Sequence, residues 1–365
     1  MAYTTIDKPT DYFNTITYTG NDTDGRTITG VGFQSDWTWV KARSSAFSHY
    51  IIDAIRYDSG ASKYLKLDSS SSAADETPSG AGWISALNSD GYVCKNGTSN
   101  TNNCNENGVT YVAWNWLGAN GTTSNTDGSI TSTVSANTTS GFSIVSYTGT
   151  GSNATVGHGL GTTPAWVLVK ERGASGESWN NFHQSLGAGI TIMLNLTNAQ
   201  QSSSTMWNNT APTSSVFSVG ADAGSNGSSK TYIAYCFAEK KGYSKFGSYT
   251  GNNLDDGTFC YTGMKPSFVM IKRTDSTSEW NIYDVKRNPF NLTNLELEAN
   301  TSDAEANVSE REIDILSNGF KLRGRSTFIN APGGSYIYMA FAENPFVTST
   351  GIPTTARWLC SYLLT

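Results

Sequence analysis

Short stretches of alternating apolar and polar residues, separated by turns rich in glycine, asparagine and serine, run along almost the whole chain. Alternation with a period of two places the apolar side chains on one face of a β-strand. Helical periodicity is scarce, and the best helical candidate is a turn or two near 302–309. The pattern therefore predicts an all-β protein built from short antiparallel strands.

Three landmarks recur three times in the same order, which predicts three tandem copies of one repeat. An aromatic strand ending in Tyr-Thr-Gly lies at 16–21, 144–150 and 246–252. An apolar strand ending in basic residues, with a lysine in register, lies at 35–43, 164–172 and 266–273. An aromatic closing strand lies at 109–116, 230–239 and 334–343. We expect the glycines of the first landmark, Gly20, Gly149 and Gly251, to allow a positive φ at a tight turn.

These landmarks divide the chain into three predicted β repeats with connecting segments. The divisions are an N-terminal arm at 1–11, repeat 1 at 12–117, a polar linker at 118–140, repeat 2 at 141–239, repeat 3 at 240–343 and a C-terminal tail at 344–365. Strand-rich repeats of this size suit antiparallel β-sandwiches of the jelly-roll or lectin-like kind. The linker has no core pattern, so we expect it to be extended or flexible and to leave repeat 1 freer than the other two.

Composition and charge narrow the classes of protein. The 365 residues are 12% aromatic and 15% charged, with a net charge of −6, and lysine or arginine never occurs in a run longer than two. Nucleic-acid binding needs a basic patch, so none is expected. No stretch approaches 18 apolar residues, so membrane insertion is not expected either. The N-terminus lacks an export signal, although the composition, rich in glycine, serine, threonine and asparagine, resembles that of exposed, extracellular proteins. A virion protein, made in the host cytoplasm and released by lysis, fits both observations.

Metal and disulfide chemistry find little support in the sequence. The five cysteines form no zinc-binding spacing with histidine, and the odd count argues against a disulfide framework. Cys94 and Cys104 flank a polar insert and either bridge a hairpin or stay reduced, whereas Cys236 is expected to be a core residue. The acidic clusters at 67–76 and 298–305 lack the spacing of an EF-hand loop. We therefore predict no metal and no cofactor.

The acidic residues and histidines leave one catalytic alternative open. Asp53, His183 and Asp284 occupy matching places in the three repeats. Two of them could form the carboxylate pair of a glycoside hydrolase, but local ion pairs with Arg56 and Arg287 are the simpler interpretation. His49 and His158 complete the histidines, which we expect at surfaces or turns, and no nucleophile elbow accompanies them. We predict no catalytic residues and no enzyme, with a polysaccharide depolymerase as the less favoured alternative.

Lysines and tryptophans are the remaining candidates for contacts. Lys41, Lys170 and Lys272 end equivalent strands, so we expect strand-end cations at the rim of a sheet, or else contacts to an acidic glycan or a neighbouring subunit. The candidate ligand-binding residues are two pairs at i, i+2 spacing: Trp37, Trp39, Trp114 and Trp116. Each pair points to one face of its strand, where it forms either core or a platform on which sugars stack. Trp179 and Trp280 match each other in repeats 2 and 3, which favours the core.

The residues at 17–44, 141–172 and 232–251 carry a resemblance to a known family. Here the chain is similar to repeat-containing proteins of tailed, mainly marine, bacteriophages, regarded as tail-fibre or other virion structural proteins. The likeness extends from about Phe13 to Phe346. It implies a virion structural protein with other virion proteins as partners, assembled as a homo-oligomer, a trimer being one option. Only about twelve residues precede repeat 1, which departs from fibres with a long shaft and favours a baseplate or capsid-decorating subunit.

Three functions are thus compared. The first is a structural protein on the particle surface, in a tail fibre, baseplate or capsid, that makes subunit or host-surface contacts. The second is a lectin-like module that binds a host surface glycan through its tryptophans. The third is a depolymerase, which would depend on Asp53, Asp284 and His183.

Overall fold

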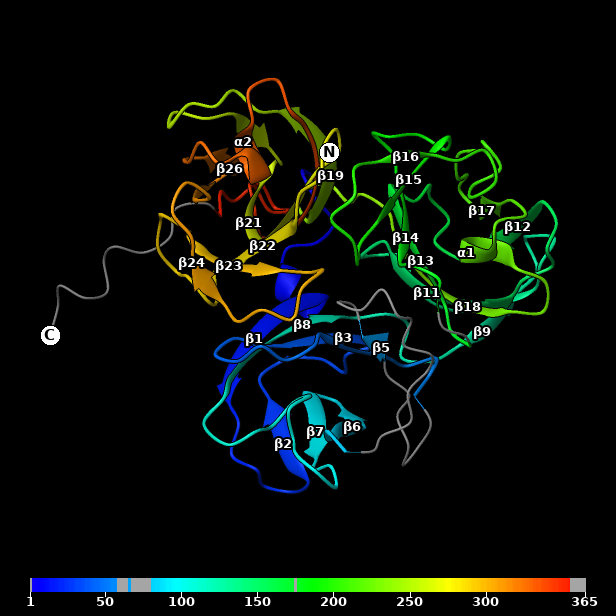
Figure 1. The fold of residues 1–365 in the computed structure, drawn as a ribbon, viewed down its shortest axis with the longest axis horizontal. Helices are drawn as coiled ribbons and strands as arrows, with labels where there is room; N and C mark the ends of the chain where they lie inside the picture. The colour runs from blue at the N-terminus through cyan, green and yellow to red at the C-terminus, as the bar shows by residue number, and fades with distance from the viewer. Residues whose placement is uncertain (1, 58–64, 67–79, 174–175, 355–365) are drawn as a thin grey trace, which may run out of the picture.

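The computed structural model describes residues 2–57, 65–66, 80–173 and 176–354, and these form an all-β protein. Three large sheets, each faced by a small one, lie around a common centre (Figure 1). We call each large sheet and the small sheet that faces it a sheet pair, numbered in chain order. All pairings between the named strands are antiparallel, as the alternating pattern predicts.

Sheet pair 1, drawn in blue and cyan, contains a five-stranded and a three-stranded sheet. The large sheet has the order β1 (Phe13–Thr19), β8 (Thr110–Trp116), β3 (Trp37–Ala42), β4 (Tyr50–Asp53) and β5 (Leu65–Lys66). The small sheet has the order β2 (Arg26–Thr29), β7 (Gly91–Lys95) and β6 (Trp83–Asn88). A 3-10 turn, η1 (Pro9–Asp11), precedes β1.

Sheet pair 2, drawn in green, contains an eight-stranded and a two-stranded sheet. The large sheet has the order β16 (Gln201–Ser202), β15 (Ile190–Met193), β14 (Asn180–His183), β13 (Trp166–Glu171), β18 (Thr231–Phe237), β11 (Phe142–Thr148), β10 (Ser132–Asn137) and β9 (Thr123–Asn125). The small sheet pairs β12 (Ala154–Gly157) with β17 (Val216–Val219). A short helix, α1 (Ala223–Asn226), follows β17.

Sheet pair 3, drawn from yellow to red, contains a six-stranded and a three-stranded sheet. The large sheet has the order β19 (Ser244–Thr250), β27 (Ser335–Pro345), β21 (Met264–Arg273), β22 (Trp280–Asp284), β23 (Leu295–Glu298) and β24 (Ala306–Asn307). The small sheet has the order β20 (Phe259–Tyr261), β26 (Gly319–Leu322) and β25 (Ile313–Leu316). A short helix, α2 (Thr327–Asn330), precedes β27.

The helical prediction at 302–309 is wrong, because this segment contains β24 and no helix. The two helices that do form have four residues each, too few to leave a helical period in the sequence. Each begins at a side-chain cap: Asp222 accepts from the N–H of Gly224, and Ser326 accepts from the N–H of Phe328. The caps are therefore the sequence signal for these helices.

The three Tyr-Thr-Gly segments lie in matching surroundings. Tyr18 stacks on Tyr111 with ring centroids 5.3 Å apart, Tyr147 on Tyr232 at 5.1 Å, and Tyr249 on Tyr336 at 4.8 Å. The tyrosine pairs join β1 to β8, β11 to β18 and β19 to β27, and the two members of each pair lie directly opposite in the register.

The reason for glycine in these segments differs from the prediction. Gly20, Gly149 and Gly251 are not among the residues with positive φ. A Cβ atom on them would lie 2.0, 2.4 and 2.3 Å from a backbone carbonyl oxygen. The expectation of a positive φ is wrong, and glycine is required here by the close approach of a second backbone.

The segment at 118–140 is not the flexible linker that its polar composition predicts. It contains β9 and β10, and β10 pairs along β11 from Thr133 opposite Ser146 to Asn137 opposite Phe142. Val134 is buried and Gly118 packs beside Asp36 of sheet pair 1. Polar residues suffice here because one face of this edge hairpin meets solvent, so the core pattern is too sparse to recognise.

The central strands of the large sheets are buried on both faces. In β3, Trp37 and Trp39 point into a core at the centre of the molecule, while Val40 and Ala42 point toward the small sheet. The same alternation holds in β13 and β21. The central core joins aromatic residues of all three sheet pairs: Phe13, Trp37, Trp39, Trp114 and Trp116; Phe142, Trp166, Trp179, Tyr235 and Phe237; Phe246, Phe268, Trp280 and Phe341. The expectation that repeat 1 is freer than the others is therefore wrong.

Candidate functional site

The four tryptophans predicted to bind ligands lie in the central core. Trp37 and Trp39 are 2% exposed, Trp116 is 1% exposed and Trp114 is fully buried. Trp37 has its ring centroid 4.3 Å from that of Trp116 and 4.6 Å from that of Tyr235 in sheet pair 2. A glycan cannot reach these rings, so the platform is a wrong prediction and the core alternative is correct. Trp179 and Trp280 are fully buried as well.

Asp53 lies at the contact between sheet pairs 1 and 2. It forms a fully buried ion pair with Arg56, and its Oδ1 accepts from the N–H groups of Ile55 and Arg56. Tyr235 of sheet pair 2 donates its hydroxyl to Asp53 Oδ2 at 2.7 Å. The predicted local ion pair is confirmed, and it also joins two sheet pairs.

Asp284 lies at the corresponding contact between sheet pairs 3 and 1. Arg287 Nε donates to Asp284 Oδ2 at 2.5 Å, and Trp114 Nε1 of sheet pair 1 donates to the same oxygen at 3.1 Å. The guanidinium of Arg287 reaches Glu305 at 2.9 Å, and Glu305 in turn binds Arg43 of sheet pair 1 at 2.7 Å. The predicted ion pair is again confirmed, and neither aspartate faces an open cleft.

His183 occupies the matching place at the contact between sheet pairs 2 and 3. It is buried, its Nδ1 accepts from the N–H of Ser185 at 3.1 Å, and its ring packs edge-on against Trp166. The next residue, Gln184, donates to the carbonyl of Phe246 in sheet pair 3 at 2.6 Å. Burial lowers the pKa of His183 to about 4, a shift that the backbone of Tyr338 partly opposes.

We expect His183 to make stability depend on pH. The unfolded imidazole takes up a proton near pH 6.5, but the folded one resists protonation until about pH 4. Its contribution is therefore complete above pH 6.5 and is lost as the pH falls toward 4, on the order of 3 kcal/mol in all. His183→Asn keeps an acceptor for the N–H of Ser185 but cannot titrate. Urea unfolding at several pH values should show a shallower loss in this variant, and parallel curves would contradict the prediction.

The repeated lysines do not lie at a solvent-exposed rim. Lys41 and Lys272 are fully buried and Lys170 is 1% exposed. Lys41 Nζ donates to the carbonyl of Ser302 in sheet pair 3 at 3.0 Å, and Lys272 Nζ donates to the carbonyl of Thr197 in sheet pair 2 at 2.8 Å. Burial lowers the pKa of Lys272 to about 8. These ammonium groups thus satisfy backbone carbonyls across contacts inside the chain, which corrects the rim prediction.

The other two histidines are also buried, so neither lies at the surface, although His158 lies in the predicted glycine-rich turn at 157–161. His49 Nδ1 accepts from Trp39 Nε1 at 2.7 Å, and its Nε2 lies 3.0 Å from the carbonyl of Glu298 in sheet pair 3. His158 Nδ1 accepts from the N–H of Leu160, and its Nε2 lies 3.2 Å from the carbonyl of Thr213. Burial lowers the pKa of both rings. Each uncharged ring therefore links two parts of the chain through its two nitrogens.

Cysteine and acidic clusters provide no metal site in the described part of the chain. Cys94 and Cys104 are buried free thiols, and the Cys94 thiol donates to the carbonyl of Cys104. Cys236 is fully buried, as predicted. Among the described residues, no three His, Cys, Asp or Glu side chains are grouped to hold a metal. The cluster at 67–76 lies outside these residues. No described helix is long and apolar enough to cross a membrane.

A small acidic hollow of about 160 Å³ lies beside β23. Arg311 Nη1 lies 3.0 Å from Glu296 and 2.8 Å from Glu298, between the two carboxylates. Burial raises the pKa of Glu296 to about 7, although Arg311 opposes the shift. The guanidinium already binds the oxygens that face it, so this hollow is an internal ion-pair network.

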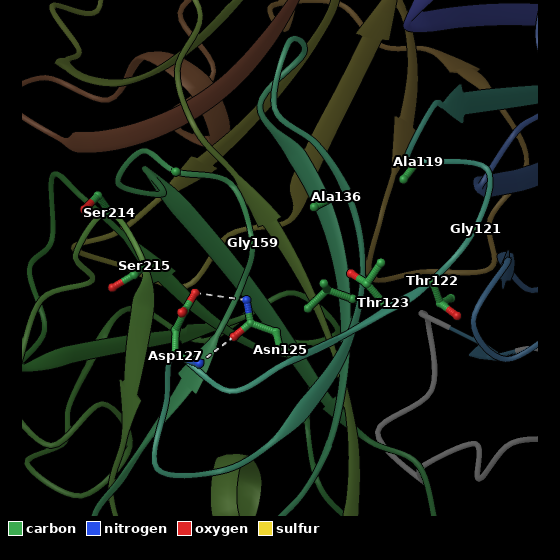
Figure 2. A pocket seen from close by; sticks show the side chains of 12 residues that line it. Ala119, Gly121, Thr122, Thr123, Asn125, Asp127, Ala136, Gly159, Ser214 and Ser215 are labelled. Carbon is green, nitrogen blue, oxygen red and sulfur yellow. Dashed lines mark hydrogen bonds between the residues drawn. The ribbon is translucent and has the colours of Figure 1, made fainter.

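A cleft of about 620 Å³ lies on sheet pair 2 where β9 and β10 meet two loops. Figure 2 shows Asn125 and Asp127 at one end, Ser214 and Ser215 on one wall and Thr122 and Thr123 opposite. Asn125 Nδ2 donates to Asp127 Oδ2, and the N–H of Asp127 donates to Asn125 Oδ1, both at 3.0 Å. Among the described residues that line this cleft, Asp127 is the one charged side chain and none has an aromatic ring.

Sequence reasoning missed this cleft. Its parts come from the segment taken for a linker, from the glycine-rich turn at 157–161 and from the loop at 213–215, which are brought together only by the fold. The Asn-x-Asp turn and the paired glycines Gly159 and Gly161, both with positive φ, were the available signals.

One comparison identifies the family. A family model described as a domain of unknown function, DUF7483, matches residues 8–345, and no curated protein matches the sequence. The matched region contains all three sheet pairs and the aromatic residues of the central core that they share. The chain therefore belongs to the DUF7483 family.

Proposed function

We propose that the three sheet pairs are copies of one antiparallel β-sandwich repeat arranged in a closed ring. The matching tyrosine stacks support this, as do the contacts between pairs. Asp53 of sheet pair 1 accepts a hydrogen bond from Tyr235 of pair 2, and Asp284 of pair 3 accepts one from Trp114 of pair 1. Tyr235 and Trp114 each lie three residues after the stacked tyrosine of their closing strand. The contacts thus run in one direction, from pair 1 to 2, 2 to 3 and 3 to 1, as in a head-to-tail trimer. The boundaries predicted at 12–117, 141–239 and 240–343 stay a prediction.

On this basis the protein is a structural subunit on the surface of a bacteriophage particle. The observation that carries the proposal is that the aspartates and histidines considered for catalysis are already bound to other residues inside the ring. Asp53, Asp284 and the three histidines hold sheet pairs or loops together. A depolymerase needs an accessible carboxylate pair, and these two carboxylates are bound to buried arginines. We therefore favour a structural role over an enzyme.

Exposed apolar side chains support contacts with other proteins of the particle. Among the described residues, all the large ones lie in sheet pair 3 or after it: Leu254, Phe259, Tyr261, Phe290, Leu292, Phe346 and Ile352. On β20, Phe259 and Tyr261 are 42% and 57% exposed, whereas the matching places on β2 are Thr27 and Thr29. The repeat does not need aromatic residues there, and exposed apolar patches are typical of interfaces.

Purified particles test the proposal directly. We expect peptides of this chain in the mass spectrum of virions banded on a density gradient, in a constant ratio to the major capsid protein. A three-lobed density in an electron-microscopy map should fit the three sheet pairs and show whether the subunit lies in a tail fibre, a baseplate or the capsid. Virions that lack the protein, although it is present in the lysate, would refute the proposal.

A further inference from the structure

We propose that the cleft between β9, β10 and the loop at 213–215 is a binding site for a neutral glycan. This inference concerns a site other than the buried tryptophans, and it does not rest on the proposed place of the protein in a particle. At about 620 Å³ the cleft has the size of ligand pockets in general. Its walls carry the hydroxyls of Thr122, Thr123, Ser214 and Ser215, which both donate and accept hydrogen bonds.

The charge of the lining selects the class of ligand. Among the described residues that line the cleft, Asp127 is the one acidic side chain, and none is a lysine, arginine or histidine. A phosphate, sulfate or uronate would meet a carboxylate without a compensating cation, which is unfavourable. The hydroxyls of a neutral sugar, in contrast, donate well to a carboxylate oxygen. The chemistry therefore matches a neutral polyhydroxylated ligand.

The acidic end of the cleft is held in place before any ligand binds. Asn125 Nδ2 donates to the carboxylate of Asp127, and the backbone N–H of Asp127 holds Asn125 in place through its Oδ1. Asn125 packs directly on β12, where a Cβ atom on Gly157 would lie 1.7 Å from Asn125 Oδ1. The N–H of Ile130 also donates to the carbonyl of Thr155 in β12, so the segment between β9 and β10 is bound to the same strand. Binding at this end of the cleft therefore loses little conformational entropy, because these side chains are already ordered.

The wall formed by Ser214 and Ser215 is held by both the backbone and the buried ring of His158. The backbone N–H of His158 donates to the carbonyl of Ser215 at 3.1 Å, and the ring Nε2 lies 3.2 Å from the carbonyl of Thr213. The turn continues through Gly159, where a Cβ atom would lie 3.2 Å from that of Ala136, so the backbone itself lines the cleft (Figure 2). His158 thus has a positioning role for Ser214 and Ser215.

The absence of an aromatic ring from the lining limits the expected affinity. Stacking on aromatic rings is not available, so binding should be weak for one chain and strong only when many copies engage one surface. A glycan array should therefore be probed with the full-length chain displayed in many copies on beads. The array should carry neutral hexose oligosaccharides and uronic-acid oligosaccharides of equal length.

Three variants decide the outcome. Asp127→Asn removes the charge but keeps the shape, and we expect at least a tenfold loss of signal on neutral glycans. Ser214→Trp, at an exposed position, should fill the cleft and abolish binding. Asp256→Asn, at an exposed aspartate of sheet pair 3 far from the cleft in the sequence, should bind like the original chain. Far-UV circular dichroism checks that each variant is folded.

Several outcomes would overturn the inference. These are no binding to any neutral glycan, a preference for the uronic-acid series, or binding that survives Ser214→Trp. None of them bears on the structural role, because the presence of the chain in purified virions is measured separately.

Discussion

Arg287→Met is expected to lower the free energy of unfolding by about 3–5 kcal/mol, because removing one partner of a buried ion pair leaves the other charge buried and uncompensated. The Arg287 side chain is fully buried, and it binds Asp284 and Glu305 at once. Methionine fills much of the same volume but leaves the carboxylate of Asp284, also fully buried, without this cation. Chemical denaturation at neutral pH measures the loss.

A second change tests the electrostatic explanation. Adding Asp284→Asn removes the buried negative charge and keeps one acceptor oxygen, so the double variant should recover part of the loss. Arg325→Met is the matched control. Arg325 binds Asp255 through two bonds of 2.7 Å, but both side chains are more than half exposed, so stability should stay unchanged. Equal losses at the two arginines would contradict this account.

Trp116→Ala is expected to cost about 3–5 kcal/mol, because it leaves a cavity where the three large sheets meet. The ring of Trp116 lies 4.3 Å from Trp37 in its own sheet pair, 6.3 Å from Phe237 in pair 2 and 5.6 Å from Phe341 in pair 3, measured between centroids. Calorimetry should show one unfolding transition in both the original chain and the variant, shifted to lower temperature in the latter, because all three pairs share this core.

Phe290→Ala provides the control for aromatic truncation. Phe290 is 79% exposed, so its loss should change stability by less than about 0.5 kcal/mol. If Trp116→Ala behaved like this control, or if the sheet pairs unfolded in separate transitions, the central core would not be what holds them together.

Local sequence chemistry accounts for much of the fold. The period-two pattern predicts the antiparallel strands, and the recurring tyrosines identify strand positions that stack in all three sheet pairs. The spacing of Asp53 to Arg56 and of Asp284 to Arg287 predicts the ion pairs that form. These features depend on residues that are close in the chain or on one pattern repeated within it, so the sequence alone is enough to predict them.

The candidate site was less predictable. The tryptophan spacing showed that Trp37 and Trp39 share a face but not what covers that face, and the same holds for the lysines that reach carbonyls of another sheet pair. The cleft depends on β9, on the turn at 157–161 and on the loop at 213–215, none of which carries a distinctive pattern alone.

By itself, the sequence determined the all-β class, the three similar segments, the local ion pairs and the lack of a recognisable catalytic motif. Only the tertiary structure decided that the second face of each large sheet is interior, that glycine in the Tyr-Thr-Gly segments serves close approach, and that a polar hairpin builds a cleft. The physical reason is that periodicity records which side chains share a face, whereas burial depends on contacts between residues far apart in the chain.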